Sequence, residues 1–198
     1  MSTTRRGRPR GYDRAAALEQ ALVLFWDRGY EATSIAELTA AMGMGAPSLY
    51  AAFGSKRQLF DEVVRSYGRT YHAFMARALV EEPTLRRGVE RLLREAASEY
   101  TRPDRPPGCL VISAAVNCSS PDVEQALRTL RASDVKAFEH LIKSATSAGE
   151  LPSDTDPHSL ALFTSVTLQG MAQQARDGAT RTELEAVAAL ALTSWPWT

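Results

Sequence analysis

Apolar residues recur along almost the whole chain at intervals of three and four, and this period constrains the fold more than any other feature of the sequence. Such spacing places apolar side chains on one face of an α-helix. No stretch of alternating β-branched residues is long enough to predict a strand. We therefore expect an all-α fold in which helices bury their apolar faces against one another.

Charged residues are distributed unevenly along the chain. With 198 residues and 44% hydrophobic content, the chain can form one large domain or two small ones. Lys plus Arg equals Asp plus Glu at 23 each, so the overall charge indicates no partner. The first 60 residues hold eight basic and five acidic residues, so they carry +3 and the remainder −3. This asymmetry favours a nucleic-acid-binding head on a body with another role.

Signals for several other protein classes are missing from the sequence. Its two cysteines, Cys109 and Cys118, cannot form a disulfide framework, and no apolar run approaches the roughly 18 residues that span a bilayer. The three histidines are far apart, and we find no metal-ligand spacing, phosphate loop or nucleophile motif. We expect a reduced, cytoplasmic protein that has no cofactor, metal or membrane segment and is not an enzyme.

Helix start and stop signals divide the chain into segments. Asp13 and Ser55 are expected N-caps, Gly29 an expected stop, and Ser34 with Glu37 an expected capping box. The helices expected from these signals cover 13–29, 34–43, a stub ending at 54, 55–82, 84–100, 109–118, 121–148, 157–177 and 181–195.

The stub is the most informative segment. Residues 43–56, GMGAPSLYAAFGSK, predict a tight turn at 43–45, then a helix of about two turns with Pro47 in its first turn and Gly54 as its stop. Leu49 and Phe53 lie four apart and should point inward. Two short helices joined by a three-residue turn predict a helix-turn-helix, whose second helix enters the DNA major groove. The alternative is a helical hairpin inside an ordinary bundle.

Residues 12–60, and most closely RGYEATSIAELTAAMGMGAPSLYAAFGSKRQLF, resemble the DNA-binding domain of TetR-family transcriptional regulators. The motifs are a glycine-aromatic pair after the first helix, Thr-Ser opening the second, Leu49-Tyr50 and Phe53 in the third, and Ser55-Lys56 opening the fourth. The rest is similar in architecture, and GCLVISAAVNCSS resembles one recurrent subgroup. The resemblance implies a flexible basic arm (1–11), a helix-turn-helix DNA-binding domain (12–60) and a helical ligand-binding and dimerisation domain (61–198).

DNA contacts follow from the same resemblance. It implies that Tyr50 contacts the DNA backbone or a base edge, that Ser48 contacts phosphate or a base, and that Lys56 contacts phosphate. A cap role alone accounts for Ser34 equally well. The family often has large side chains where Ala51 and Ala52 stand, so two backbone contacts are expected to be missing. The predicted DNA-binding residues are Arg5, Arg6, Arg8, Arg10, Thr33, Ser34, Gly45, Ala46, Pro47, Ser48, Tyr50 and Lys56. The four arginines of the arm suit a narrow minor groove, although a solvated tail would have the same composition.

The resemblance also implies a regulatory cavity, although aromatic residues at helical spacing are more often plain core. The predicted ligand-binding residues are Tyr67, Tyr71, Phe74, Tyr100, Ser113, Asn117, Phe138, Phe163 and Gln169. The apolar faces of the last two helices imply a homodimer. The implied protein is a dimeric repressor that leaves double-stranded operator DNA when a small apolar or aromatic effector binds, with coupling through the helix that starts at Ser55.

Two alternatives stay open. The first is a thiol- or redox-responsive regulator that uses Cys109 or Cys118. The expected helix would hold these cysteines about 13 Å apart, and their apolar neighbours favour two buried, unreactive thiols instead. The second is a helical ligand-binding protein without a DNA role.

Overall fold

The computed structural model describes residues 13–114 and 118–198, and every regular element within those ranges is a helix, which confirms the predicted fold class. The helices are α1 (Arg14–Ala32), α2 (Ile35–Met42), α3 (Ala46–Phe53), α4 (Lys56–Thr70), α5 (Ala73–Glu81), α6 (Leu85–Tyr100), α7 (Leu110–Ser113), α8 (Pro121–Ser147), α9 (Pro157–Arg176) and α10 (Arg181–Thr193). None of the described helices is both long and apolar enough to cross a membrane.

Local side-chain caps set the helix starts in the N-terminal part, as predicted. The Asp13 carboxylate accepts hydrogen bonds from the backbone N–H groups of Ala15 and Ala16. Ser34 and Glu37 form the reciprocal capping box of α2, and the Ser55 hydroxyl accepts from the N–H of Gln58 at the start of α4. Each cap satisfies backbone donors that a helix cannot satisfy internally, so these boundaries depend on residues a few positions apart.

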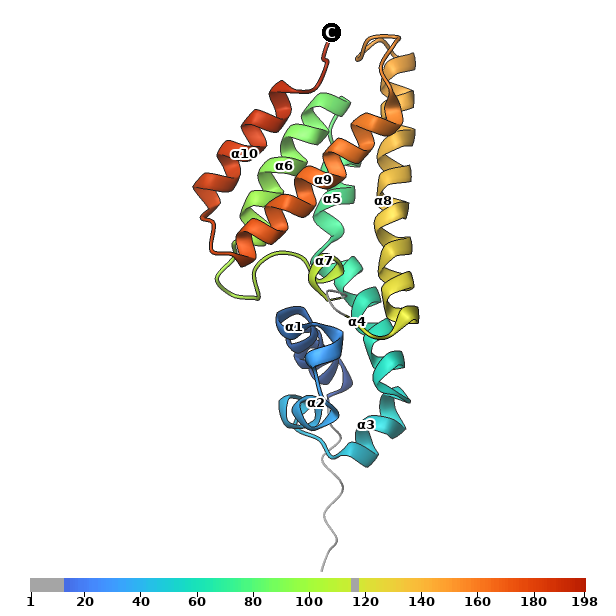
Figure 1. Cartoon of the computed structure of the whole chain (residues 1–198), viewed down its shortest axis with the longest axis vertical. Coiled ribbons are helices and arrows are strands. Elements are labelled where there is room, and N and C mark those ends of the chain that lie inside the picture. Colours follow the sequence, from blue (N-terminus) through green and yellow to red (C-terminus); the bar gives the residue numbers. More distant parts are fainter. Residues whose placement is uncertain (1–12, 115–117) are drawn as a thin grey trace, which may run out of the picture.

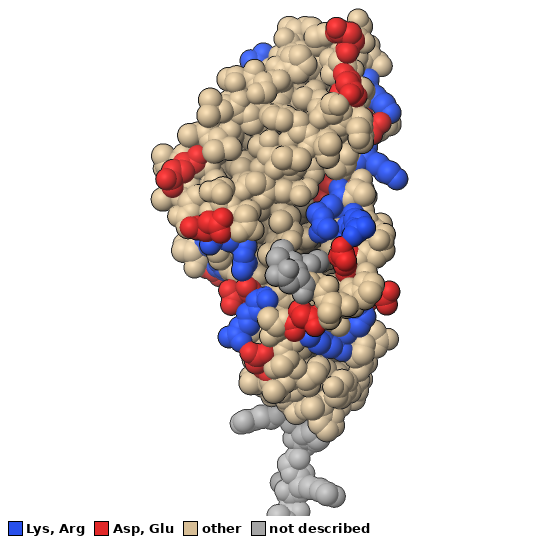
Figure 2. Space-filling view, in the orientation of Figure 1, with Lys and Arg blue, Asp and Glu red and all other residues tan. Residues whose placement is uncertain are grey.

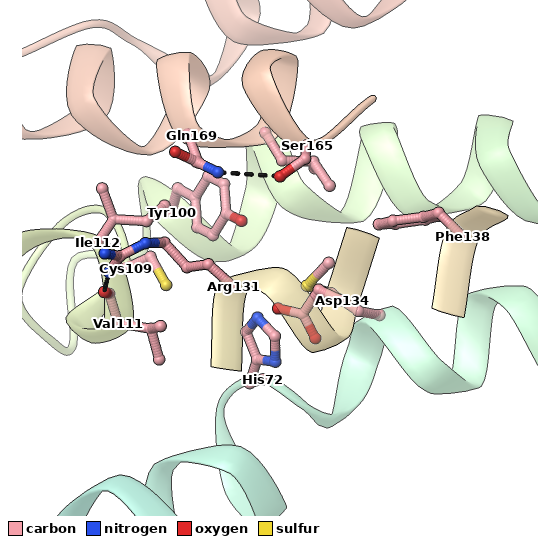
Figure 3. Close-up of a pocket in the computed structure, with 12 residues that line it drawn as sticks. His72, Tyr100, Cys109, Val111, Ile112, Arg131, Asp134, Phe138, Ser165 and Gln169 are labelled. Atoms are coloured by element: carbon pink, nitrogen blue, oxygen red, sulfur yellow. Dashed lines mark hydrogen bonds between the residues drawn. The ribbon is translucent and has the colours of Figure 1, made fainter. Parts of the chain in front are cut away.

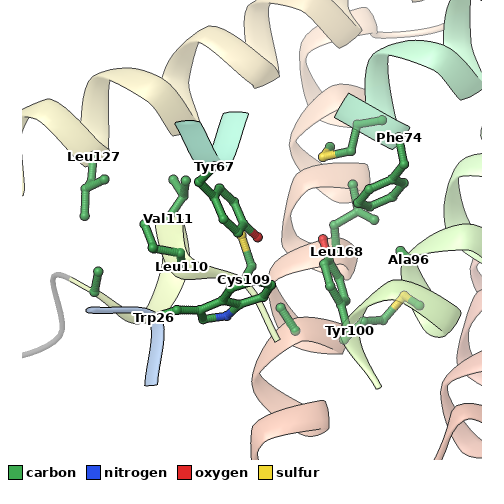
Figure 4. Close-up of a cluster of buried hydrophobic side chains, with 14 of the residues drawn as sticks. Trp26, Tyr67, Phe74, Ala96, Tyr100, Cys109, Leu110, Val111, Leu127 and Leu168 are labelled. Carbon is green, nitrogen blue, oxygen red and sulfur yellow. The ribbon is translucent and has the colours of Figure 1, made fainter. Parts of the chain in front are cut away.

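Figure 1 shows α1, α2 and α3 together at one end of the molecule, which we call the head. Helix α4 leads from the head into the body, and the long α8 runs along one side of the body beside α9. A continuous core joins the two parts. Figure 4 shows Trp26 of α1 beside Tyr67 of α4 and Cys109 and Leu110 of the α7 region, and all four are buried.

Main-chain atoms make much of the contact between head and body. Gly29 has the positive φ of 81° that interrupts α1, and the next N–H, from Tyr30, donates to the carbonyl of Ala114 at 3.1 Å. The guanidinium of Arg176 on α9 donates to the carbonyl oxygens of Trp26 and Asp27 at 3.2 and 2.9 Å. The end of α1 is therefore attached to both α7 and α9.

Two predicted helices differ from the structure. The helix expected over 55–82 breaks after Thr70, because Tyr71 and His72 close its end with N–H bonds to the carbonyl of Tyr67 at 2.9 and 3.0 Å. The Tyr71 hydroxyl donates to Glu19, a contact 52 residues away that periodicity does not reveal. The helix expected over 109–118 is the four-residue α7, and residues 115–117 lie outside the described ranges.

Candidate DNA-reading surface and regulatory cavity

Helix α3 is a short stub between two glycines that have positive φ angles. Gly43 ends α2 in the left-handed region at φ 65°, and Gly54 ends α3 at φ 80°. A side chain at either position would disfavour these angles. Pro47 lies in the first turn of α3, as predicted. The stub is consequently confined to two turns and set at a fixed angle to α2.

The two faces of α3 differ sharply in burial. Leu49 is fully buried and Phe53 is 3% exposed, whereas Tyr50 is 48% exposed. Pro47 and Ser48 are also exposed, while Ala46 is half-buried. The predicted facing of the stub is confirmed. Small side chains around one exposed tyrosine leave a thin surface that can enter a groove about 12 Å wide.

Thr33 does not lie where a phosphate contact requires it. Its side chain is fully buried, and its hydroxyl donates to the carbonyl of Gly29 at 2.7 Å. The hydroxyl therefore closes the break in α1, and the structure corrects its expected DNA role. Ser34 is exposed but already serves as the cap of α2.

Lys56 differs in its charge pairing from the described basic residues of the head and from its neighbour Arg57 at the start of α4. Arg14 pairs with Glu62 at 2.8 Å, Arg57 with Asp61 at 3.0 Å, and Arg28 with Glu37. Lys56 has no ion pair among the described residues, and its Nζ lies 4.4 Å from the ring centre of Tyr30. Partial burial lowers the pKa of this amine, which the charge of Glu31 partly offsets. Arg5, Arg6, Arg8 and Arg10 lie outside the described residues.

Two adjoining hollows lie in the body and share His72, Met75, Asp134 and Phe138. Figure 3 shows residues that line the smaller one, including His72, Asp134 and Phe138. The larger, of about 180 Å³, lies between α5, the end of α4 and the middle of α8, and its other lining residues are Gly68, Ala73, Ala76, Leu79 and Ala137. The smaller, of about 30 Å³, extends toward α7 and α9, and its other lining residues are Tyr100, Cys109, Val111, Ile112, Arg131, Ser165, Leu168 and Gln169. We call the two together the regulatory cavity.

Three of the predicted ligand-binding residues line this cavity. Tyr100 and Phe138 contribute rings, and the Gln169 amide donates to the Ser165 hydroxyl at 2.9 Å. These side chains come from α6, α8 and α9, so distant parts of the chain meet here (Figure 3).

The structure places the other predicted ligand residues elsewhere. Tyr67 and Phe74 are buried in the core, and Tyr71 turns to Glu19. The Ser113 hydroxyl donates to the carbonyl of Cys109 at 3.1 Å, and Phe163 lies 36% exposed on the outer side of α9. The predicted cavity role of these five residues is corrected: the core takes Tyr67 and Phe74, hydrogen bonds hold Tyr71 and Ser113, and Phe163 faces away from the cavity. Asn117 lies outside the described residues.

The sequence does not reveal the ionisable side chains of the cavity, His72, Arg131 and Asp134. His72 lies at the break between α4 and α5, and burial lowers the pKa of its imidazole, opposed by the charge of Asp134. Burial raises the pKa of the Asp134 carboxyl. The Arg131 guanidinium donates to the carbonyl of Val111 at 2.8 Å. Arg131 and Asp134 are three apart on α8, but no local signal marks that face as part of a cavity.

The two cysteines differ in environment. Cys109 is 2% exposed, as expected, and burial raises the pKa of its thiol. Cys118 is only half-buried, and its thiol lies 3.8 Å from a carboxylate oxygen of Glu31. Neither forms a disulfide.

An apolar surface covers the outer side of α9 and α10. Figure 2 shows a broad area of this face without charged side chains, above a band of mixed charges where head and body meet. Leu162, Phe163, Val166, Val187 and Leu190 are 36–69% exposed there. We call these five residues the α9–α10 face.

Comparisons with known proteins agree with this architecture. Residues 17–63 match the family described as "Bacterial regulatory proteins, tetR family", and residues 84–190 match "Tetracyclin repressor-like, C-terminal domain". Two similar proteins of Escherichia coli are named HTH-type transcriptional repressors. ComR is 36% identical to this chain, and the match covers 96% of this chain and 92% of ComR. BdcR is 30% identical, and the match covers 93% of this chain and 90% of BdcR. A cysteine mutant of the TetR family transcriptional regulator CifR, solved with 26-bp double-strand operator DNA, is 40% identical, with a TM-score of 0.90 over 96% of this chain and 100% of its own.

Proposed function

The chain belongs to the TetR family of bacterial transcriptional regulators, which bind DNA and are not enzymes, and we propose that it is a homodimeric repressor released from operator DNA by a small molecule. It acts in the cytoplasm, where α3 of each subunit enters a major groove and the regulatory cavity receives the effector. Relatives named repressors and the CifR complex with operator DNA support this proposal.

The observation that carries the DNA role is the division of α3 into a buried and an exposed face. Leu49 and Phe53 fix the stub to the head, and Tyr50 and Ser48 are left at the surface. Since only two polar side chains reach outward from this stub, methyl contacts with thymine and DNA shape supply much of the specificity. Lys56, free of an ion pair in the described chain, supplies a phosphate contact beside it.

Dimerisation is proposed through the α9–α10 face. A contiguous apolar surface on a monomer marks an interaction site, and a two-fold dimer buries the same patch of both copies. Val166 and Leu190, at 59% and 69% exposed, are the most exposed large apolar side chains of the face. Two copies joined here hold two reader helices at a fixed spacing.

Coupling between effector and DNA has two structural connections. His72 lines the cavity at the point where α4, the helix leading to the head, ends. Val111 and Ile112 line the cavity on α7, and the carbonyl of Ala114, which caps α7, accepts the N–H of Tyr30 in the head. An effector that shifts α5 or α7 therefore changes the position of α1 and α4, and with them the separation of the two α3 helices.

A thiol-responsive release is the second candidate, because Cys109 lines the same cavity. Burial raises its pKa and so disfavours the reactive thiolate. Non-reducing electrophoresis after mild oxidation, with operator binding measured on the same samples, separates the two candidates. A cysteine-dependent dimer band that tracks loss of DNA binding would favour the thiol mechanism.

The proposal is tested by a gel-shift of the purified protein against its own upstream DNA, together with light scattering for mass. We expect a shifted band that weakens steeply with salt and a dimer in solution. Loss of the band on adding compounds from a ligand-shift thermal screen would support effector release. A protein that shifts no upstream fragment even at low salt would refute the DNA role.

A further inference from the structure

The larger hollow of the regulatory cavity combines apolar walls with one acidic side chain, that of Asp134. We propose that it takes a small organic amine, with an apolar body of about one ring in the hollow and a protonated nitrogen at the Asp134 carboxylate. The inference rests on the proposed function, because it names the chemical class of the effector that the cavity receives.

Small side chains create the space for the apolar body. Gly68, Ala73, Ala76 and Ala137 leave a hollow of about 180 Å³, and three of them are exposed, so the hollow opens to solvent on that side. A dry engineered cavity of about 150 Å³ holds benzene, so this volume suits one ring. Met75, Leu79 and Phe138 supply apolar walls of matching character.

The Asp134 carboxyl group favours a positive charge at the other end of the ligand. Asp134 is half-buried at the junction of the two hollows, and its carboxylate forms no hydrogen bond or ion pair with any described residue. Arg131 is on the same helix, but it lines only the smaller hollow and its guanidinium is turned to the carbonyl of Val111. A partly buried carboxyl without a partner is costly to ionise, which is why its pKa is raised, and a cationic ligand would offset that cost by supplying the counter-charge.

The remaining ionisable groups of the cavity do not supply the missing cation. Burial lowers the pKa of His72, so the imidazole is neutral at neutral pH. Tyr100 and Cys109 are also neutral, because burial raises their pKa values. The Asp134 carboxylate would repel an anionic ligand. A neutral ligand would leave that carboxylate without a counter-charge.

Three probes of similar size test the class: benzylamine, benzyl alcohol and benzoate, titrated into the full-length protein at pH 7.5 by calorimetry and thermal shift. We expect benzylamine to bind at least about tenfold more tightly than benzyl alcohol. A tenfold difference in affinity is at the low end of what a hydrogen bond to a charged group contributes. Asp134→Asn, nearly equal in shape, should remove that preference. Asp122→Asn, which changes an exposed carboxylate on the same helix, should retain it.

Location is tested by Ala137→Phe, which fills the larger hollow and should abolish benzylamine binding. Equal affinity of wild type and Asp134→Asn for benzylamine, a wild-type preference for benzyl alcohol or benzoate, or no binding of any probe would each overturn the amine class. Gel-shifts with the same probes separate this inference from the proposed function. If benzylamine binds through Asp134 but leaves operator affinity unchanged, the amine site stands and effector release fails.

Discussion

The head and the body of this protein are both helical, yet they are built on different kinds of interaction. In the head, caps such as Ser34 and Ser55 start helices within three residues, and the described arginines pair with carboxylates. In the body, the cavity brings together side chains from six helices and leaves the Asp134 carboxylate without a partner in the described chain. The described arginines of the head thus have carboxylate partners, whereas the body retains an unpaired carboxyl group that a ligand can complete.

The largest expected effect is that of Tyr50→Ala on the reader. Because the ring is 48% exposed, its loss should abolish specific operator binding while dimer mass and thermal stability stay nearly unchanged. Gel-shift and thermal melting on the same preparation check this. A melting temperature well below that of wild type would show that the ring stabilises the fold of the head. It would contradict the division of α3 into a DNA-reading face and a packing face.

Next in size is Leu190→Asp on the α9–α10 face. A charge placed in the proposed interface should give monomers at micromolar concentration and weaken operator binding through loss of paired reader helices. Val80→Asp is the matched control, because Val80 is 80% exposed on α5, outside this face. Monomers from both variants, or from neither, would argue against this face as the dimer interface.

Leu49→Ala removes a fully buried side chain from the head and should cost about 2–5 kcal/mol of unfolding free energy. Denaturant unfolding measures this cost, and the expected result is the reverse of that for Tyr50→Ala. A loss below about 1 kcal/mol would mean that the core of the head closes over the cavity and that Leu49 does not hold α3 in place.

Lys56→Ala should weaken binding to all DNA sequences about equally and reduce the salt slope of log affinity by about one. Arg28→Ala is the control, because Arg28 is already paired with Glu37. The slope is measured by gel-shift between 50 and 200 mM salt. An unchanged slope for Lys56→Ala would remove Lys56 from the phosphate contacts.

The smallest effect concerns His72 and pH. The folded pKa of His72 lies below the usual value of about 6.5, so the unfolded chain binds the proton first as the pH falls. This contribution to stability is present above the unfolded pKa and is lost as the pH falls toward the folded pKa. Between pH 7.5 and 5.5, His72→Gln should therefore lose less stability than wild type in urea unfolding. His140→Gln, at an exposed position on α8, should follow wild type.

Sequence reasoning succeeds here where structure depends on near neighbours. The Ser34–Glu37 capping box, the glycine turn and the opposite facing of Leu49 and Tyr50 all follow from residues a few positions apart. It fails where distant segments meet. At the helix break, the Tyr71 hydroxyl contacts Glu19, 52 residues earlier, and no local pattern reveals that contact.

The candidate cavity shows the same limit. Tyr100, Phe138 and Gln169 were predicted among its lining residues, but His72 and Asp134 were not. A histidine or aspartate on a helix has no local signal of burial, since solvent exposure is decided by the helices that pack across it. The prediction of Phe163 failed for the same reason, because aromatic residues on a core face and on an outer face have the same spacing.

The attachment of α1 to the body has a consequence for exchanging parts between related proteins. Arg176 contacts the carbonyl oxygens of Trp26 and Asp27, and Ala114 accepts the N–H of Tyr30, so neither contact depends on the side chains of the head. Any head whose first helix ends with the same backbone path can form these bonds. A graft of a foreign reader onto this body should therefore keep glycine at position 29 and Arg176, while the bases that it recognises can be chosen independently.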